Sequence, residues 1–415
     1  MFERAYRQRL EADVARWQAE GVITPATGET IRNSLPPLAG INIPVVVGIV
    51  GGLLIAAAFL AFVAANWTEI PRVLRFAILL AGIAGAYGIG AGFARAGRPV
   101  LADLAASVGA IIFGATIALV GQMYHLSDDF AAGLLLWAAG ALAAAALTGS
   151  RGALAVALAS GVVWTSDRVV GAADVPHLPF VPFWMLAAVL ALAWNSRVAG
   201  HLVTLAALAW WGAAAGGRSE NLFIGADGAA LLFGAGLLLS NARWDSLRSF
   251  GVTLSSYGAI ALAVMAAAFA ANTSAEFPIA TASPAWAVGC GFAGMILAFA
   301  AAVIGRQPAA IFAATSIALV LVVVDGWVQP ATGEPWVAHV LELAAVLCLV
   351  ISGTLDGARA RAVAGWLGLA GVIASVTWAV KGSLLHRSIF LAAAGAVAIT
   401  LAMLLGRVLP KESRR

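Results

Sequence analysis

Residues 43–65 read IPVVVGIVGGLLIAAAFLAFVAA, and this unbroken apolar run decides the class of the protein. A helix needs about 20 apolar residues to cross the hydrocarbon core of a bilayer. The run is long enough for that and contains no charged side chain. It therefore predicts a membrane-spanning helix soon after the N-terminus.

Thirteen further apolar runs follow, separated by short polar turns. The fourteen predicted spans are 43–65, 76–95, 101–121, 130–148, 152–167, 178–195, 199–215, 221–240, 250–271, 284–304, 309–328, 336–353, 361–380 and 387–408. The runs at 152–167 and 199–215 are short, so either could be a re-entrant segment, and the count carries an error of about two. We predict an all-α, polytopic membrane helix bundle of about fourteen transmembrane helices. Glycine pairs spaced four apart, such as Gly88 and Gly92, predict close helix packing.

The composition excludes a water-soluble fold. Charged residues make up 11% of the chain and hydrophobic residues 62%, and the mean hydropathy is +0.95. A soluble domain carries about a quarter charged residues. Cys290 and Cys348 both fall within apolar runs, which predicts two small buried side chains. The chain therefore belongs in a lipid bilayer.

Basic side chains are distributed unevenly between the two sides of the predicted bundle. With the N-terminus in the cytoplasm, eighteen of the twenty-four Lys and Arg residues fall on the cytoplasmic side and six on the outer side. Cytoplasmic loops of membrane proteins carry such an excess. A missed span would move the later loops to the other side and blur the asymmetry. The pattern favours an even number of spans, with both termini cytoplasmic.

The residues before the first span predict a small helical hairpin. Apolar residues recur every three or four positions over residues 2–20, which places them on one helical face: Phe2, Tyr6, Leu10, Val14 and Trp17. Gly21 ends this helix. Thr24 then offers an N-cap and Pro25 a first helical position, so a second helix runs to about Asn33.

Three segments follow from these patterns: a cytoplasmic amphipathic hairpin at 1–40, a transmembrane helical domain at 41–410 and a cytoplasmic tail at 411–415. The hairpin has no apolar h-region, so the first span is expected to act as the insertion signal. Its apolar face could dock on the membrane domain, lie in the membrane interface or bind a partner.

Two polar clusters are expected at the outer surface. They follow the first and third spans and contain Asn66, Glu69, Arg72, Arg75, Gln122, Tyr124, His125, Asp128 and Asp129. The two arginines of the first cluster can meet the two aspartates of the second. One hypothesis is an outward-facing mouth in which His125 changes charge between about pH 5 and 8. The alternative is a set of caps and ion pairs that close this end of the bundle.

Ionisable residues within the spans are stronger candidates, because a charge in hydrocarbon is costly unless it is paired or hydrated. Asp227, Asp325 and Glu342 lie in the outer halves of their spans, and His339 shares a helical face with Glu342. Together with the two clusters they predict one outward-facing polar cavity. In it Glu342 or Asp227 would accept a proton or cation, and an arginine would contact an anion. The alternative is that each carboxyl is protonated or hydrogen-bonded for packing alone.

Other chemistry is not indicated. The sequence lacks a phosphate-binding loop, an HExxH motif and a GxSxG motif, and none of its five His residues has metal-ligand spacing relative to another. The Arg residues of the hairpin alternate with acidic residues, which argues against a nucleic-acid surface. We expect no enzymatic activity, no cofactor, no metal and no nucleic-acid partner.

Two motifs resemble a known family. Residues 64–72 read AANWTEIPR, and residues 113–128 read FGATIALVGQMYHLSD, followed by LLW at 135–137. Together with the hairpin, these stretches resemble the bacterial membrane-protein family called domain of unknown function 2157, over residues 1–145. The resemblance implies an inner-membrane location and no established activity.

Two functional hypotheses remain open from the sequence. The first is a transporter, either a carrier or a flippase of a lipid-linked substrate, with a small molecule or a lipid as ligand. The second is a non-transporting scaffold or envelope-associated protein whose hairpin binds a partner. An intramembrane enzyme acting on a lipid would require His339 and Glu342 to approach His125 or the arginines. The sequence does not decide the ligand, the coupling ion or the oligomeric state.

Overall fold

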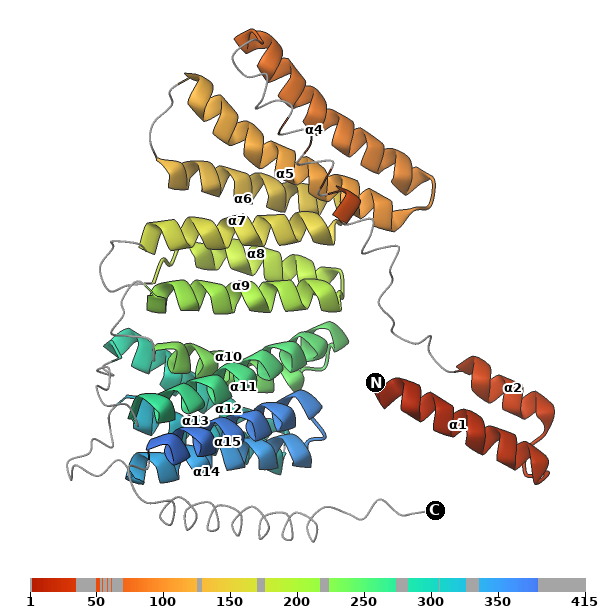
Figure 1. Cartoon of the computed structure of the whole chain (residues 1–415), viewed down its shortest axis with the longest axis vertical. Helices are drawn as coiled ribbons and strands as arrows, with labels where there is room; N and C mark the ends of the chain where they lie inside the picture. Colours follow the sequence, from red (N-terminus) through yellow and green to blue (C-terminus); the bar gives the residue numbers. More distant parts are fainter. Residues whose placement is uncertain are drawn as a thin grey trace. The chain divides into compact units, whose positions relative to one another are not determined.

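The computed structural model describes residues 2–34, 50–52, 54, 58, 61, 70–124, 129–169, 176–216, 224–273, 283–305, 307–325 and 336–379. All regular secondary structure in these ranges is helical, which confirms the predicted all-α class (Figure 1). The chain divides into two compact units, Met1–Ala58 and Phe59–Arg415. The predicted boundary at residue 40 lies outside the described residues.

The first unit contains the predicted hairpin, formed by α1 (Phe2–Ala19) and α2 (Pro25–Ser34). Gly21 follows α1 with a φ of 72°, a left-handed conformation that glycine adopts without steric cost. The Thr24 hydroxyl accepts a hydrogen bond from the backbone N–H of Thr27 at 3.2 Å, as an N-cap should. Both predicted helix boundaries are therefore confirmed.

In the described part of the second unit, twelve helices overlap the twelve central predicted spans. They are α4 (Arg72–Arg95), α5 (Pro99–Tyr124), α6 (Phe130–Thr148), α7 (Arg151–Val169), α8 (Phe180–Ala193), α9 (Arg197–Gly216), α10 (Ile224–Ser240), α11 (Asp245–Thr273), α12 (Ala285–Gly305), α13 (Pro308–Val324), α14 (Trp336–Leu355) and α15 (Arg359–Ala379). Most of the span at 43–65, and all of the span at 387–408, lie outside the described residues.

The helix lengths differ from the predicted ones. The two runs that were expected to be short form continuous helices, α7 with 19 residues and α9 with 20. The shortest helix described in this unit is instead α8, with 14 residues. By length and composition, six of the described helices can cross a membrane, namely α4, α5, α6, α11, α12 and α14. Three shorter apolar helices accompany them, α8, α10 and α13.

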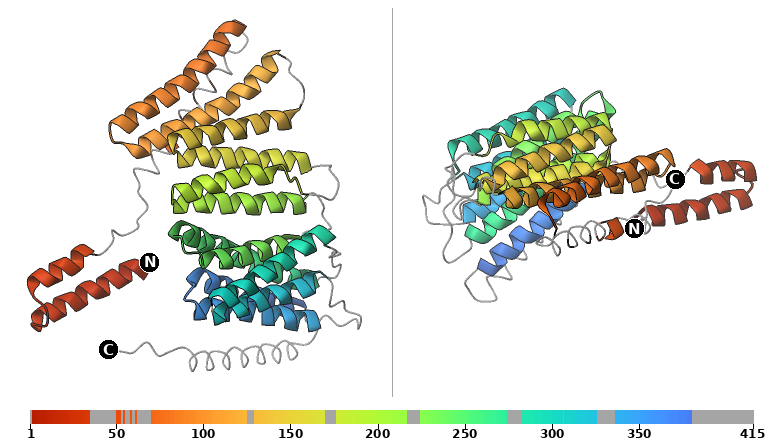
Figure 2. Two further views of the ribbon diagram at one scale, coloured as in Figure 1. Left: turned by 180° about the vertical axis from the view of Figure 1, so that it is seen from behind. Right: turned by 90° about the horizontal axis from the view of Figure 1, so that it is seen from above.

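Two hydrophobic cores organise the second unit. In chain order each helix from α4 to α9 packs against the next, as the views in Figures 1 and 2 show. Helices α10 to α15 form a separate cluster around Phe233, Leu262 and Ile317. Phe250 and Leu254 near the start of α11 belong to the first core, so α11 joins the two groups.

Close helix crossings in the α10–α15 cluster depend on glycine. A Cβ placed at Gly234 on α10 would overlap the carbonyl oxygen of Gly294 on α12. Gly353 on α14 and Ala362 on α15 approach each other in the same way. The predicted pair at Gly88 and Gly92 is different, because no described heavy atom lies within 4 Å of a Cβ at either position. Their regular spacing therefore did not identify a helix contact among the described residues.

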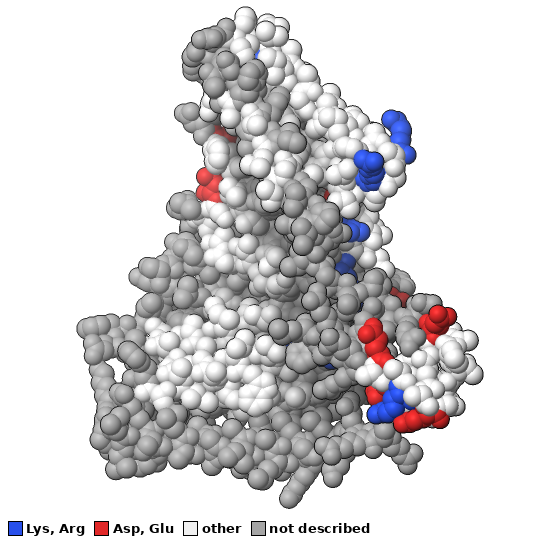
Figure 3. All heavy atoms as spheres, turned by 45° about the vertical axis from the view of Figure 1, so that its right-hand side comes forward, with Lys and Arg blue, Asp and Glu red and all other residues white. Residues whose placement is uncertain are grey.

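The helices alternate in direction, so their short described turns lie at one end of the unit (Figure 1). We call this the basic end, because its turns and flanking helix ends carry Arg95, Arg98, Arg151, Arg197, Arg243, Arg248, Arg359 and Arg361. In the upper half of Figure 3, basic side chains lie along the right-hand edge and acidic side chains lie on the left. The charged residues described at the opposite end are Arg75, Asp129, Asp167, Arg168 and Asp325. The charge asymmetry expected from the sequence is thus present in the fold.

Candidate functional site

The described residues that were predicted to share one cavity lie on two sets of helices. Arg75 lies on α4, and Gln122 and Tyr124 lie on α5. Helix α4 packs against α5, and α5 also packs against α6 and α7. The remaining described candidates belong to the α10–α15 cluster: Asp227, Asp325, His339 and Glu342. Asn66, Glu69, His125 and Asp128 lie outside the described residues, as does the side chain of Arg72. The described candidates therefore form two groups rather than one.

The group on α4 and α5 supports the capping alternative. Asp129 had been expected to meet an arginine of α4, but both of its carboxyl oxygens accept hydrogen bonds from Nη2 of Arg168 on α7 at 2.8 Å. Oδ1 of Asp129 also caps α6 by accepting the N–H of Ala132 at 3.1 Å. The Arg168 guanidinium and this cap lower the pKa of Asp129. Arg75 donates from Nε to the carbonyl oxygen of Ile70 at 2.6 Å.

Asp227 is the most unusual residue of the second group. It lies in the first turn of α10, and its side chain is completely buried. Neither carboxyl oxygen makes a well-formed hydrogen bond to a described residue, although the Ser283 hydroxyl lies near enough to act on the carboxyl. A Cβ placed at Gly291 on α12 would overlap Oδ1 of Asp227, so the carboxyl packs directly against that helix. A carboxylate held in this way would lack the partners that normally offset its desolvation.

A second carboxyl lies within electrostatic range of the first. Asp325 forms the C-cap of α13, and its negative charge acts on the Asp227 carboxyl. The two oxygens of Asp325 are also buried and make no well-formed hydrogen bond in the described ranges. Ser283, which precedes α12, is a polar neighbour of both carboxyls. We call Asp227, Asp325 and Ser283 the carboxyl pair site.

The surroundings of the carboxyl pair site are apolar. Trp211 on α9 is 6% exposed, and its indole Nε1 donates to the carbonyl oxygen of Ile224 at 2.7 Å. Gly228, directly after Asp227, leaves the space that this indole ring occupies. Trp211, Ile224 and Ala287 form a small hydrophobic core of their own. Indole and alkyl groups exclude water from this side of the site, which strengthens electrostatic interactions there.

His339 and Glu342 form a separate buried pair on α14. The imidazole Nδ1 lies 3.0 Å from Oε2 of Glu342, which confirms the prediction that they share a helical face. They are 7% and 1% exposed. The second oxygen of Glu342, Oε1, has no described hydrogen-bond partner. The pair can therefore hold a proton between the imidazole and the carboxyl, and it still has an unused acceptor.

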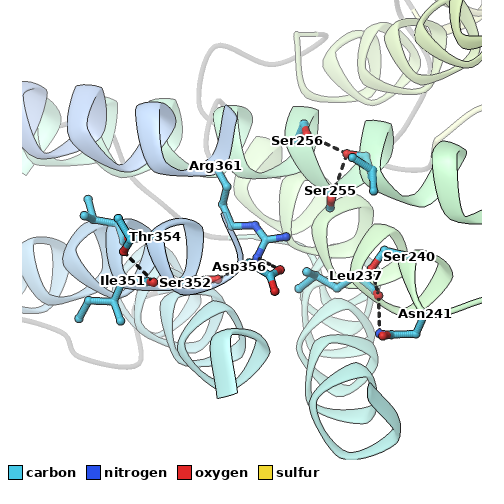
Figure 4. Close-up of polar contacts among 12 residues, drawn as sticks. Leu237, Ser240, Asn241, Ser255, Ser256, Ile351, Ser352, Thr354, Asp356 and Arg361 are labelled. Carbon is cyan, nitrogen blue, oxygen red and sulfur yellow. Dashed lines mark hydrogen bonds and ion pairs between the residues drawn. The ribbon is translucent and has the colours of Figure 1, made fainter. Parts of the chain in front are cut away.

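Arg361 is a buried charge that the sequence did not single out, because it was one of the eighteen basic residues counted on the cytoplasmic side. It is 5% exposed and donates from Nη1 to Ser352 at 3.1 Å and to Asp356 at 2.9 Å (Figure 4). Its guanidinium carbon lies 5.6 Å from the ring centre of Phe233 on α10. Arg361 thus ties α14 and α15 to α10 at the basic end.

Asp103 also makes contacts that hold two helices together. It lies in the first turns of α5. Its Oδ1 accepts hydrogen bonds from the Ser150 hydroxyl at 2.5 Å and from the N–H of Gly152 at 3.2 Å. This contact fastens α5 to the start of α7. Because its carboxyl is used in this contact, Asp103 is not a candidate for ligand binding.

No metal centre is indicated in the described ranges, because they contain no group of three or more His, Cys, Asp or Glu side chains able to hold an ion. The carboxyl pair site supplies two carboxyls and one hydroxyl. It can accept protons, and it offers few ligands to a metal ion. Its chemistry is therefore that of a titratable site inside an apolar helix cluster.

The residues of the second sequence motif contribute to packing. A Cβ at Gly114 on α5 would overlap the indole ring of Trp137 on α6, and a Cβ at Gly140 on α6 would overlap the Phe113 ring. The Trp137 indole donates from Nε1 to the carbonyl oxygen of Ala110 at 2.9 Å. These aromatic residues and glycines interlock α5 with α6, which gives the motif a structural role.

Comparison with known proteins gives one match. Residues 15–154 match the family model described as "Predicted membrane protein (DUF2157)". No curated protein and no solved structure matches the chain. The matched segment includes both interlocked motif helices, α5 and α6, and ends before the carboxyl pair site. The chain is thus a predicted membrane protein similar to this family over residues 15–154, as its two motifs indicated.

Proposed function

We propose that this protein is a carrier in the bacterial inner membrane, with about fourteen spans and both termini in the cytoplasm. The apolar helices and the match to a family of predicted membrane proteins support the membrane environment. The basic end supports the orientation, because arginines accumulate on the cytoplasmic side of membrane proteins. The resemblance of the first third of the chain to a bacterial family favours the inner membrane.

One observation carries the proposal of transport: two carboxyls, Asp227 and Asp325, are buried in the helix cluster with the Ser283 hydroxyl as their shared polar neighbour and with no described basic side chain against them. Such groups are costly to keep in an apolar environment. Within membrane domains they commonly mark pathways for ions, protons or substrates. A scaffold has no need of them, because hydrophobic side chains would pack as well or better.

The carboxyl pair site also lies between several helices, where a substrate could bind. Its residues come from α10, from the end of α13 and from the segment before α12, with Trp211 of α9 beside them. Small shifts among these helices would change the distance between the carboxyls. Two substrate classes fit: a small molecule moved by a carrier, or a lipid-linked molecule moved by a flippase. The carboxyls would supply the energetic coupling.

Native mass spectrometry of the detergent-extracted protein tests this proposal. The wild type is compared with Asp227→Asn, an isosteric change at the site, and with Asp167→Asn, a change at an exposed position on α7. We expect a discrete small molecule or lipid to stay with the wild type and with Asp167→Asn and to leave Asp227→Asn. The same featureless lipid background on all three proteins would contradict a carrier with this binding site.

A scaffold remains the second candidate because the hairpin belongs to a compact unit of its own. Val14 is fully buried between α1 and α2, while Val22 in the turn is 67% exposed. Deletion of residues 2–34 separates the two functions. A carrier lacking the hairpin should retain the bound molecule in native mass spectra. A scaffold should show no such molecule before or after the deletion and should lose its protein partner.

A further inference from the structure

We propose that the ion bound at the carboxyl pair site is a proton and not a metal cation. This inference rests on the proposed function, for which it names the coupling ion. It is carried by two features of the site. The charge of the two carboxyls is not offset by a described basic side chain, and the described residues offer few oxygen ligands for a coordinated cation.

The charges around the site come first. Asp325 and Cys290 are the titratable neighbours of Asp227, from α13 and α12. On α9 and α11, which also pack against α10, the charged and titratable side chains lie toward the opposite, basic end or midway along the helix: Arg197, His201, Asp245, Arg248 and Tyr257. No described basic side chain neutralises the pair. Two carboxylates that interact in an apolar site cannot both stay ionised, so at least one must bind a positive ion.

The ligands that the site offers then distinguish a proton from a metal cation. A hard cation such as Ca²⁺ or Mg²⁺ takes about six oxygen ligands. The described residues of the site supply two carboxyls and one hydroxyl, and Gly291, against which Oδ1 of Asp227 packs, adds no side-chain ligand. A proton needs no coordination sphere, so this set of groups suits a proton better than a metal cation.

Ser283 adds a hydroxyl group that can donate a hydrogen bond to an ionised carboxyl of the site. Its hydroxyl neighbours both carboxyls and can donate to whichever of them is ionised. The carboxyl oxygens of both Asp227 and Asp325 are buried, although Asp325 as a whole residue is partly exposed at the end of α13.

Infrared difference spectroscopy of the purified full-length protein tests the inference. The probe is the carbonyl stretching band of a protonated carboxyl, followed as the pH is raised, in the wild type, Asp227→Asn and Asp325→Asn. Asp167→Asn is the exposed control. We expect a band in the wild type that disappears at high pH. Either substitution at the site should remove or shift the band, and the control should keep it.

Salt additions at constant pH supply a test that needs no variant. Sodium, potassium, calcium and magnesium chlorides are compared with choline chloride at equal ionic strength. For a proton site the wild-type band should be unchanged by all five salts. Displacement of the band by a metal chloride but not by choline chloride would overturn the inference in favour of a cation site. A band that is identical in wild type and both site variants would overturn it as well.

Carbodiimide labelling gives a second measurement on the wild type, because carbodiimides react with protonated carboxyls in apolar surroundings. Peptide mapping should find the label on Asp227 or Asp325 and less of it at higher pH. Label absent from both residues over the whole pH range would count against a proton there. The infrared and labelling measurements do not depend on ligand retention. The proton inference can therefore fail while the carrier proposal stands, and the carrier proposal can fail while the proton inference stands.

Discussion

The carboxyl oxygen Oδ1 of Asp227 on α10 packs directly against Gly291 on α12. A Cβ at position 291 would overlap this oxygen and crowd the side chain of Leu321. Gly289, two residues earlier on the same helix, has no described heavy atom within 4 Å of such a Cβ. The two glycines share a helix and differ in what they face. They therefore form a matched pair for testing how closely the site is packed.

We predict that Gly291→Ala displaces the Asp227 carboxyl and destabilises the protein by about 1–3 kcal/mol, the usual cost of overpacking. Ligand retention in native mass spectra should weaken with it. Gly289→Ala should match the wild type or improve slightly on it, since alanine favours a helix. Thermal unfolding in detergent measures the difference. Equal melting temperatures for the two variants would show that α10 and α12 are not packed this closely.

Arg361 offers a second stability test. Arg361→Met keeps the length of the side chain but removes both hydrogen bonds, and it leaves the partly buried Asp356 without its cation. The loss of one partner from such a pair costs on the order of 2–3 kcal/mol. The melting temperature should therefore fall by several degrees. Arg359→Met, at an exposed position two residues earlier, is the control and should change little.

Arg361→Lys refines this test. A lysine keeps the charge but cannot make the same two hydrogen bonds from a planar group, so its melting temperature should lie between those of the wild type and Arg361→Met. If Lys and Met variants melt at the same temperature, charge is unimportant and the guanidinium geometry holds the turn. If Arg361→Met has the same melting temperature as the wild type, the Arg361 contact in Figure 4 does not stabilise the protein.

Local features of the fold followed from the sequence because they depend on neighbouring residues alone. The hairpin boundaries are set by Gly21 and by the Thr24–Pro25 pair, which terminate and start helices by their own backbone preferences. Continuous apolar runs gave the central helices. His339 and Glu342 met because residues three apart on a helix must lie on one face. In each case the relevant geometry repeats within a single element.

Contacts between helices did not follow in the same way. Asp129 could pair with any arginine at its end of the bundle, and the choice of Arg168 over Arg75 depends on α6 and α7 lying side by side. The burial of Arg361 did not follow from the sequence, because burial depends on the neighbours that cover a residue. The grouping of Asp227 with Asp325, across a long stretch of chain, depends in the same way on how α10, α12 and α13 pack. Hydropathy gives the depth of a residue but not its neighbours.

The α10–α12 crossing provides a third prediction. Gly234 and Gly294 bring the two backbones into contact, so Gly234→Leu must push the helices apart. We expect a protein that is severely destabilised or fails to fold, because the obstacle is backbone and not a flexible side chain. Gly88→Leu on α4 should be tolerated, since the space beside it is open among the described residues. Expression level and size-exclusion profile are the measurements, and equal tolerance of both changes would contradict the crossing.

His177 gives a prediction for pH. It lies before α8, its Nδ1 is 3.1 Å from the Thr165 hydroxyl, and its ring contacts Trp164 edge-on. Partial burial lowers the pKa of His177, and the nearby positive charge of Arg168 lowers it further. The neutral imidazole is thus favoured in the folded protein. Stability contributed by this site is present above the ordinary pKa of 6.5 and is lost as the pH falls below it.

The comparison of wild type with His177→Gln measures this contribution. Melting temperatures are recorded from about pH 7.5 down to about pH 5, where histidine is the main side chain that changes charge. The wild type should lose more stability than the variant over this range, because glutamine cannot become charged. Parallel curves for the two proteins would show that protonation of His177 does not oppose folding.

The Asp129–Arg168 ion pair provides the last prediction, which concerns salt. Both side chains are more than two-fifths exposed, so their attraction should be weak and screened by ions. Asp129→Asn removes the charge but preserves the N-cap of α6, because asparagine caps helices as well as aspartate does. We therefore expect a small loss of melting temperature at low ionic strength that disappears at high ionic strength. The pKa of Asp129 is lowered, so the loss should also vanish in strong acid, where the wild-type carboxyl is protonated below its ordinary value of 3.8. A loss that persists in high salt would assign the effect to the cap and not to the pair.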